Sequence, residues 1–385
     1  MEDDTIMNKL NHLRIRGFRR LYDVDFDLRP LMVMIGANGV GKTSILDAVS
    51  LLSASASGNL NAELSALGGI GSLLTRGIAK SLAFNISMEV PGRSPLDYSL
   101  ELQSQGNGYQ IAREELSQER GLPDPFKHII TDGTRIRYHD GNNLVSPNWD
   151  FEHEESALSQ APRMFREPEE FRKVLSTVTR YHALDVGPRA PVKLPQPMKP
   201  ALLPGADGED LVPLLYSLRE GDHSRFDAII DSLHAAFPTF EALSFPPVAA
   251  GTLAMTWKDK CFDKPLYMNE LSEGTLRFLW LAALLQSPSL STVTMIDEPE
   301  VSLHPELLSL LADLMREASA RTQLIVATHS DRLIRFLEPK EVMVMDSAED
   351  GLTTATWADQ LDLEKWLEDY TLDEVWRMGR MGGRA

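Results

Sequence analysis

The first informative pattern covers residues 13–35, where apolar and polar positions alternate. Leu13 and Ile15 alternate with arginines, and residues 22–28 alternate Tyr, Val, Phe and Leu with three aspartates. This period of two predicts two half-buried antiparallel strands. The run LMVMI at 31–35 is apolar throughout, which is typical of a strand buried on both faces. A glycine-rich turn follows, and then a helix that carries Ile45, Leu46, Val49 and Leu52.

The pattern changes twice further along the chain. Residues 54–80 are rich in Ser, Ala, Gly and Asn, and we expect a flexible loop with one short helix there. Strands at 82–90, 96–103 and 109–111 predict a small antiparallel sheet. Residues 115–245 carry charge-rich stretches and a proline-rich link, and they predict an inserted helical subdomain with helices at 168–178, 209–220 and 224–236.

Helices and strands alternate again from residue 271 onwards. The pattern predicts helices at 275–285 and 305–318, and strands at 292–296, 324–327 and 342–345. This order calls for a parallel sheet covered by helices. We therefore expect an α/β fold with a mixed parallel sheet, a small antiparallel sheet and a helical insertion. The expected parts are an N-terminal half at 1–114, the insertion at 115–245 and a C-terminal half at 246–385.

Composition narrows the class of protein. Of 385 residues, 43% are hydrophobic and 24% charged, values that exclude a mainly disordered chain. The net charge of −18 argues against general coating of nucleic acid or an anionic membrane, although the arginines at 14, 16, 19 and 20 leave a local patch open. The single Cys261 cannot form an internal disulfide, which fits a reducing cytoplasm. Residues 1–4 are acidic, unlike a signal peptide, and no apolar run is long enough to span a membrane.

The segment GANGVGKT at 36–43 matches the phosphate-binding loop pattern G-x-x-x-x-G-K-[ST]. Its glycines let backbone N–H groups converge on phosphate oxygens, and the following helix presents its positive N-terminus to the same anion. A chance glycine-rich turn is the alternative, but the buried strand before it and the helix after it favour nucleotide binding. In this interpretation Lys42 reaches the β- and γ-phosphates and Thr43 binds Mg²⁺. The predicted ATP contacts are Gly36, Asn38, Gly39, Gly41, Lys42, Thr43 and Ser44.

An acidic pair follows the predicted strand at 292–296. Asp297 would lie beside the Mg²⁺, and Glu298 would polarise an attacking water. A solvated acidic turn is the alternative, and the phosphate loop upstream makes the functional interpretation stronger.

Two further segments carry candidate site residues. In LSEGT at 271–275, Ser272 and Gly274 stand at a helix start and could donate to an anion, or Ser272 could be an ordinary capping residue. His329 directly follows the apolar strand segment at 324–328, and ligands gather at the carboxyl edge of a parallel sheet. A structural histidine is the alternative there.

These motifs together resemble those of ABC-type ATPases of the SMC/RecF class. More narrowly, the chain resembles stand-alone AAA-family ATPases (AAA_21-like) that are related to the ATPase half of OLD-family proteins. The matching segments are LRIRGFRRLYDVDFDL, LSEGTLRFLWLAALL, IDEPEVSLHP, VATHSDRLI and the closing GRMGG. The resemblance is close in the two flanking parts and looser in the insertion.

The resemblance implies a head-to-tail dimer with two ATP molecules sandwiched at the interface. Ser272 and Gly274 of one subunit would cap the γ-phosphate held by the other. Glu298 would activate water, His329 would contact the γ-phosphate, and Lys42 would complete the catalytic set. Arg19 stands where related proteins place a basic residue near the nucleotide, but a surface arginine without such a role is equally compatible.

The chain departs from the family pattern at three places. The signature is LSEGT rather than the LSGGQ of transporters, and His304 stands where many relatives have aspartate. The Q-loop glutamine is not identified among Gln103, Gln105 and Gln160.

By resemblance we expect an ATP-hydrolysing dimeric switch that uses ATP and Mg²⁺. OLD-type relatives carry a TOPRIM nuclease domain after the ATPase half, and we expect such a nuclease here to be a separately encoded partner in anti-phage defence. The alternative is a RecF-like repair ATPase that contacts DNA. A transporter nucleotide-binding domain fits the motifs less well.

Overall fold

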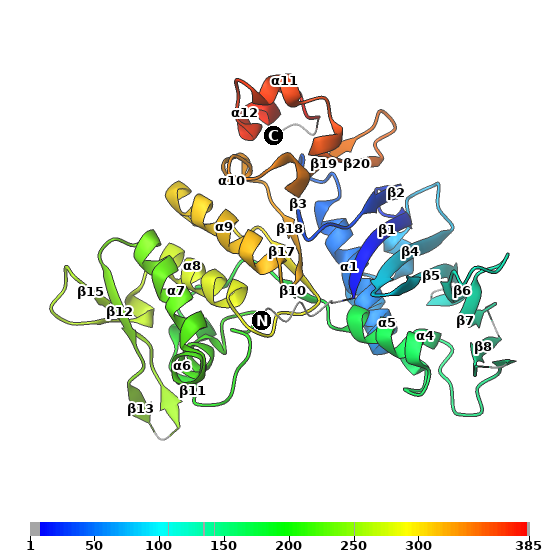
Figure 1. Ribbon diagram of the computed structural model, residues 1–385, viewed down its shortest axis with the longest axis horizontal. Helices are drawn as coiled ribbons and strands as arrows, with labels where there is room; N and C mark the ends of the chain where they lie inside the picture. Colours follow the sequence, from blue (N-terminus) through cyan, green and yellow to red (C-terminus); the bar gives the residue numbers. More distant parts are fainter. Residues whose placement is uncertain (1–7, 107, 134, 142, 250, 383–385) are drawn as a thin grey trace.

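The structure, a computed structural model, describes residues 8–106, 108–133, 135–141, 143–249 and 251–382. The acidic residues at 1–4 and the last glycine of GRMGG lie outside the described residues. Within them, the central sheet has the strand order β10-β17-β18-β3-β19-β20 (Figure 1). Neighbouring strands are parallel except for β19 with β20, so the expected α/β fold is confirmed. The strands are β3 (Leu31–Ile35), β10 (Thr179–Tyr181), β17 (Val293–Asp297), β18 (Gln323–Ala327), β19 (Val342–Ser347) and β20 (Thr353–Trp357).

Alternate residues of each central strand face two different hydrophobic cores. On β3, Leu31, Val33 and Ile35 join one core, and Met32 and Met34 join the other. The strand is buried on both faces because successive side chains point to opposite sides of a sheet. The continuous apolar run that predicted this strand follows directly from its position in the middle of the sheet.

The core that contains Met32 and Met34 lies between the parallel sheet and a large antiparallel sheet, with α1 (Lys42–Ser57) in it. The two alternating strands predicted at the start of the chain are confirmed, with Leu13 opposite Phe26 and Ile15 opposite Val24. The helices α4 (Ala157–Gln160) and α5 (Arg166–Ser176) pack on α1. The antiparallel order is β2 (Leu21–Asp27), β1 (Lys9–Phe18), β4 (Ser81–Val90), β5 (Arg93–Gln105), β6 (Gly108–Gln118), β7 (Phe126–Thr131), β8 (Ile136–His139) and β9 (Leu144–Val145).

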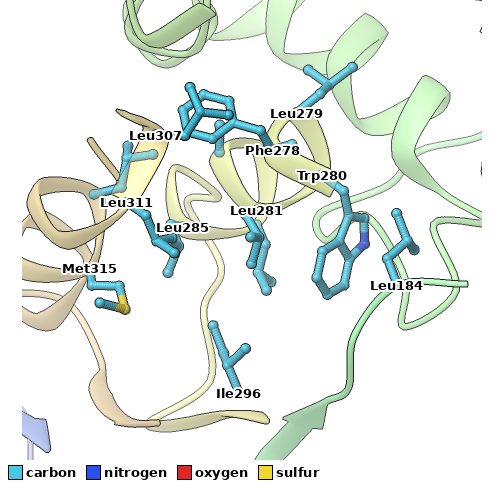
Figure 2. Packing of buried hydrophobic residues seen from close by; sticks show 14 of the residues in the cluster. Leu184, Phe278, Leu279, Trp280, Leu281, Leu285, Ile296, Leu307, Leu311 and Met315 are labelled. Atoms are coloured by element: carbon cyan, nitrogen blue, oxygen red, sulfur yellow. The ribbon is translucent and has the colours of Figure 1, made fainter. Parts of the chain in front are cut away.

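The opposite face of the parallel sheet is covered by α8 (Glu273–Leu285) and α9 (Leu308–Ser319). Figure 2 shows Leu281 of α8 pointing toward Ile296 of β17, and Leu285 lying beside Met315 of α9. Trp280 is fully buried beside Leu184 (Figure 2). The phosphate-loop helix and the helix of the LSEGT segment are therefore on opposite sides of one sheet.

Two small sheets and two helices complete the part of the molecule around α8, at the left of Figure 1. The helices α6 (Leu211–Gly221) and α7 (His223–Ala236) confirm two of the predicted helices, and α5 confirms the third. The strands are β11 (Gln196–Pro197), β14 (Thr252–Leu253) and β13 (Pro247–Ala249) in one sheet, and β12 (Phe240–Ser244), β15 (Thr256–Asp259) and β16 (Leu266–Tyr267) in the other.

The segment 115–245, predicted to be a helical subdomain, contains strands as well as helices. Residue 115 falls inside β6, and β7 to β9 extend the antiparallel sheet beyond it. β10 belongs to the central parallel sheet, where Arg180 lies opposite Met295. The strands β7 to β10 are only two to six residues long, too short for a period of two to be recognised, while the neighbouring charge-rich stretches favoured helices. The three-part division of the chain remains a prediction.

The flexible loop predicted at 54–80 is wrong for most of its length. α1 continues to Ser57 and ends at Gly58, whose φ of 73° is left-handed. Two further helices follow, α2 (Leu60–Ala66) and α3 (Ile70–Leu73). Small residues such as Ser55 and Ala56 are buried here, so their abundance reflects close packing rather than flexibility.

The remaining short elements lie mainly near the C-terminal end, in orange and red at the top of Figure 1. These short elements are η1 (Pro191–Lys193), η2 (Met268–Glu270), η3 (Pro305–Leu307), α10 (Asp331–Ile334), η4 (Pro339–Glu341), η5 (Ala358–Gln360), α11 (Glu364–Leu367) and α12 (Leu372–Arg377).

No helix among the described residues combines the length and the apolar composition needed to cross a membrane.

Candidate functional site

The glycines of the loop at 36–43 are required by its backbone path between β3 and α1. Gly36 has a φ of 146°, and a Cβ added there would lie 2.2 Å from the carbonyl oxygen of Met345 on β19. Gly41 has a φ of 116°, which side chains rarely adopt. Asn38 and Gly39 are exposed at the tip of the loop. The loop therefore packs tightly at its base and stays open at its tip.

Lys42 begins α1 and turns back onto the loop that precedes it. Its Nζ donates to the carbonyl oxygens of Gly36 at 2.6 Å and Ala37 at 3.2 Å. The side chain is buried, and burial lowers the pKa of Lys42 to about 8, against the opposing effect of the Glu298, Asp297 and Glu300 carboxylates. Lys42 thus places a buried ammonium, held by two carbonyl oxygens, at the base of the glycine loop.

Asp297 and Glu298 stand at the carboxyl end of β17. The backbone N–H of Glu298 donates to the carbonyl oxygen of Ala327 on β18 at 2.8 Å, which joins the ends of the two strands. Glu298 has a φ of 53°, a left-handed conformation that costs a non-glycine residue of order 1–3 kcal/mol. The side chain of Glu298 is 46% exposed, so water reaches its carboxylate.

His329 follows β18, which lies between the phosphate-loop strand β3 and the acidic strand β17. Its Nδ1 is 3.3 Å from Nζ of Lys42, and its Nε2 is 3.9 Å from Oε1 of Glu298. Because an ammonium only donates, Nδ1 is the acceptor and the proton of the neutral ring is on Nε2. Burial, and then the Lys42 charge, lower the pKa of His329, which favours this neutral form.

Glu300 fixes the backbone of this histidine. Its Oε1 accepts from the Thr328 hydroxyl at 2.6 Å and from the His329 backbone N–H at 3.1 Å. Burial raises the pKa of Glu300, and its Oε2 is buried with no hydrogen-bond partner in the described part of the chain. Glu300 thus links the end of β17 to the residue that follows β18.

A second set of charges lies beside Asp297. Arg180 of β10 donates to Oδ1 of Asp47 on α1 at 2.5 Å and to Oδ2 of Asp297 at 3.2 Å. Arg19 also pairs with Asp47. Arg19 has a φ of 51° and a half-buried side chain, so it differs from an unconstrained surface arginine. Among the described residues, Arg19 forms its ion pair with the Asp47 carboxylate.

The other predicted loop residues lie at the start of α1. Thr43 is exposed and Ser44 is buried. The Thr43 hydroxyl and the Asp297 carboxylate are hard oxygen ligands of the kind that Mg²⁺ prefers. Thr43 also lies one helical turn before Asp47, on the same face of α1. The residues present therefore fit a magnesium ion.

Ser272 and Gly274 are not brought to the phosphate loop. Ser272 is the N-cap of α8, and its Oγ accepts from the Thr275 backbone N–H at 3.1 Å, as the capping alternative predicted. A Cβ added at Gly274 would lie 2.8 Å from the carbonyl oxygen of Ser302. Arg277 donates to the carbonyl oxygen of Val301 at 3.1 Å. Ser272 remains exposed at the start of α8.

The buried strand, glycine loop and helix, with an acidic strand end in the same parallel sheet, define a P-loop NTPase fold of the ABC and SMC-head type. The AAA_21 family model, described as "AAA domain, putative AbiEii toxin, Type IV TA system", matches residues 31–335, and the chain belongs to this family.

Two solved structures share this fold. The chain is similar over 90% of its length to 97% of the SMC head bound to the C-winged helix domain of ScpA, with a TM-score of 0.56 and 15% identity. It is similar over 94% of its length to 98% of the SMC head domain with an extended coiled coil bound to the C-terminal domain of ScpA derived from Pyrococcus furiosus, with a TM-score of 0.56 and 14% identity.

A local sequence match points to a different kind of relative. The chain is 46% identical over 43 residues to an OLD nuclease of Thermus scotoductus. The match covers 11% of this chain and 8% of the nuclease, so it includes a small part of that protein.

Proposed function

We propose that the chain is a Mg²⁺-dependent ATPase that acts as a dimeric switch. The observation that carries this proposal is the meeting of Lys42, Glu298 and His329 at the carboxyl ends of three neighbouring strands, β3, β18 and β17. Ligands of open α/β sheets bind at this edge. The open tip of the glycine loop lies beside these groups and would receive the triphosphate.

Each side chain of the candidate site would have its own role in ATP hydrolysis. Lys42 and the loop N–H groups would bind the β- and γ-phosphates, exchanging the loop carbonyls for phosphate oxygens as partners of Nζ. Glu298 would orient a water and accept its proton at the carboxylate. His329 would donate from Nε2 to the γ-phosphate. Thr43 and Asp297 would hold the Mg²⁺, which supplies neutralisation of the charge that develops on the phosphate oxygens.

The position of Ser272 and Gly274 supports the proposed dimer. They stand at the start of α8, which lies across the sheet from α1, so their proposed contact with the nucleotide requires a second copy of the chain. The first experiment measures the mass of the Glu298→Gln variant by light scattering with and without ATP and Mg²⁺. A dimer that forms only with ATP supports the switch, and a monomer under both conditions contradicts it.

A mixing experiment tests whether one site uses both subunits. Lys42→Ala and Ser272→Ala should each abolish turnover, because each removes one side of the sandwich. A mixture of the two inactive variants contains mixed dimers with one intact site and should recover part of the activity. No recovery at any ratio contradicts the sandwich.

The proposed role is control of a separately encoded nuclease-type effector in anti-phage defence, in the cytoplasm. The local match to an OLD nuclease supports kinship with that kind of protein. The test is co-expression with a TOPRIM-like nuclease encoded beside this gene, followed by DNA cleavage with ATP, comparing the wild type with Lys42→Ala. Cleavage that is identical for the two proteins contradicts control by ATP.

The RecF-like alternative requires a basic surface. Two of the four arginines that could have formed it are neutralised, because Arg14 pairs with Asp23 at 2.8 Å and Arg19 pairs with Asp47. This pairing disfavours direct DNA binding through that patch. Duplex binding that weakens steeply with salt would restore the alternative.

A further inference from the structure

Arg180 joins the two acidic elements of the candidate site. It lies on β10, the edge strand of the central sheet, and its side chain is 17% exposed. One terminal nitrogen donates to Asp47 at 2.5 Å, and the other donates to Asp297 at 3.2 Å. The guanidinium therefore connects the helix that begins at the phosphate loop with the strand that carries the acidic pair.

The two contacts of Arg180 depend on the shape of the arginine side chain. Its guanidinium is a planar fork with donors in fixed directions, so two contacts fix the orientation of both carboxylates. The described ion pairs of Asp297, to Arg180 at 3.2 Å and to His182 at 3.9 Å, both end on Oδ2. Oδ1 of Asp297 takes no part in these two ion pairs.

Asp47 has two cationic partners. Arg19 is one of them, and Arg180 is the other and also contacts Asp297. Asp47 lies one helical turn after Thr43, whose hydroxyl is predicted to bind Mg²⁺. Arg180 is thus placed to fix the relative position of the two residues expected to bind the ion, Thr43 on α1 and Asp297 on β17.

We propose that Arg180 is a positioning residue for the divalent cation: it holds Asp297 through Oδ2, anchors it to α1 through Asp47, and presents Oδ1 to the ion. This inference rests on the proposed function, because it concerns the same nucleotide site. Groups that orient metal-binding carboxylates affect metal affinity by about 10- to 100-fold when they are removed.

The test measures the binding of Mn²⁺ in the presence of ATP, from the electron paramagnetic resonance signal of free Mn²⁺. The variant is Arg180→Gln. We expect its affinity for Mn²⁺ with ATP to fall by about 10- to 100-fold, while its affinity for ATP in EDTA changes much less. Charge alone predicts the opposite, since loss of a cation beside Asp297 would strengthen the attraction for Mn²⁺. The sign of the change therefore separates positioning from charge neutralisation.

The matched control is Arg316→Gln, which removes a half-buried arginine from the Glu341 carboxylate at 2.8 Å, away from the site. It should bind Mn²⁺ and ATP as the wild type does. Arg180→Lys keeps the charge but loses the fork, and we expect it to regain only part of the affinity. If Arg180→Gln does not fold, Arg180→Lys carries the test, because it keeps the charge and should still weaken Mn²⁺ binding.

Two outcomes overturn different statements. Unchanged or tighter Mn²⁺ binding by the folded Arg180 variants overturns the positioning role and leaves the proposed ATPase intact. A wild-type protein that binds no Mn²⁺ with ATP overturns the proposed function itself.

Discussion

Glu114 is a fully buried carboxylate whose ionisation should make the stability of the protein depend on pH. It lies on β6 and accepts three hydrogen bonds, from Ala157 N–H at 2.7 Å, Leu158 N–H at 2.8 Å and the Tyr98 hydroxyl at 2.9 Å. Burial raises the pKa of Glu114 to about 7, and these three donors limit the rise. The group thus joins the antiparallel sheet to the start of α4.

The sign and size of the effect follow from the two pKa values. The pKa is about 7 in the folded protein and close to the usual 4.5 in the unfolded chain. Between these values the folded state binds more protons than the unfolded state, so the free energy of unfolding falls as the pH rises. The contribution is fully present below about pH 4.5 and lost above about pH 7. Between about pH 5 and about pH 8 it amounts to roughly 2–3 kcal/mol.

The assay is urea denaturation followed by circular dichroism across this pH range, for the wild type and for Glu114→Gln. The variant cannot titrate, and its amide nitrogen would face the Ala157 N–H, so at acid pH it should be less stable by about 1–3 kcal/mol. The two stabilities should approach each other or cross as the pH rises. A difference between the two proteins that stays constant from about pH 5 to about pH 8 would refute the reasoning.

Three substitutions test other contacts. Gly274→Ala places a Cβ 2.8 Å from the carbonyl oxygen of Ser302 and should lower stability by about 1–3 kcal/mol, measured by thermal unfolding; an unchanged melting temperature contradicts the close contact. Trp280→Ala empties a fully buried site and should lower the free energy of unfolding, measured in urea, by about 3–5 kcal/mol. A loss below about 1 kcal/mol would contradict the packing around Trp280. Glu300→Ala should lower kcat by about 10- to 100-fold with little change in KM, because the His329 backbone is no longer fixed, and Glu300→Gln should restore much of the rate.

The candidate site was predictable where its residues are neighbours in the sequence. The loop at 36–43, the pair Asp297 and Glu298, and His329 each follow a strand whose pattern is visible in one short segment. Glu300 stood within the same acidic segment, but its role depends on its contact with the His329 backbone. The roles of all these residues remain predictions, while the strands that position them are confirmed.

Asp47 and Arg180 were missed for a physical reason. Asp47 is four residues after Thr43, so the helical period could have placed it beside the metal site. Arg180 lies 133 residues from Asp47 and 117 from Asp297, and only the assembled sheet brings the three together. The same limitation explains why β10, a three-residue strand, was not recognised as a member of the parallel sheet.

The position of β3 has a consequence for synthesis of the protein. Its two ladder partners are β18 and β19, so Val33 pairs with Val326 and with Val342. A chain still on the ribosome exposes this apolar strand long before its two ladder partners exist, and of the antiparallel sheet only β1 and β2 have been made by then. Transiently exposed apolar strands favour aggregation and engage chaperones. The phosphate loop acquires its support only after residues 323–347 emerge, so fragments that end before these residues should not bind nucleotide.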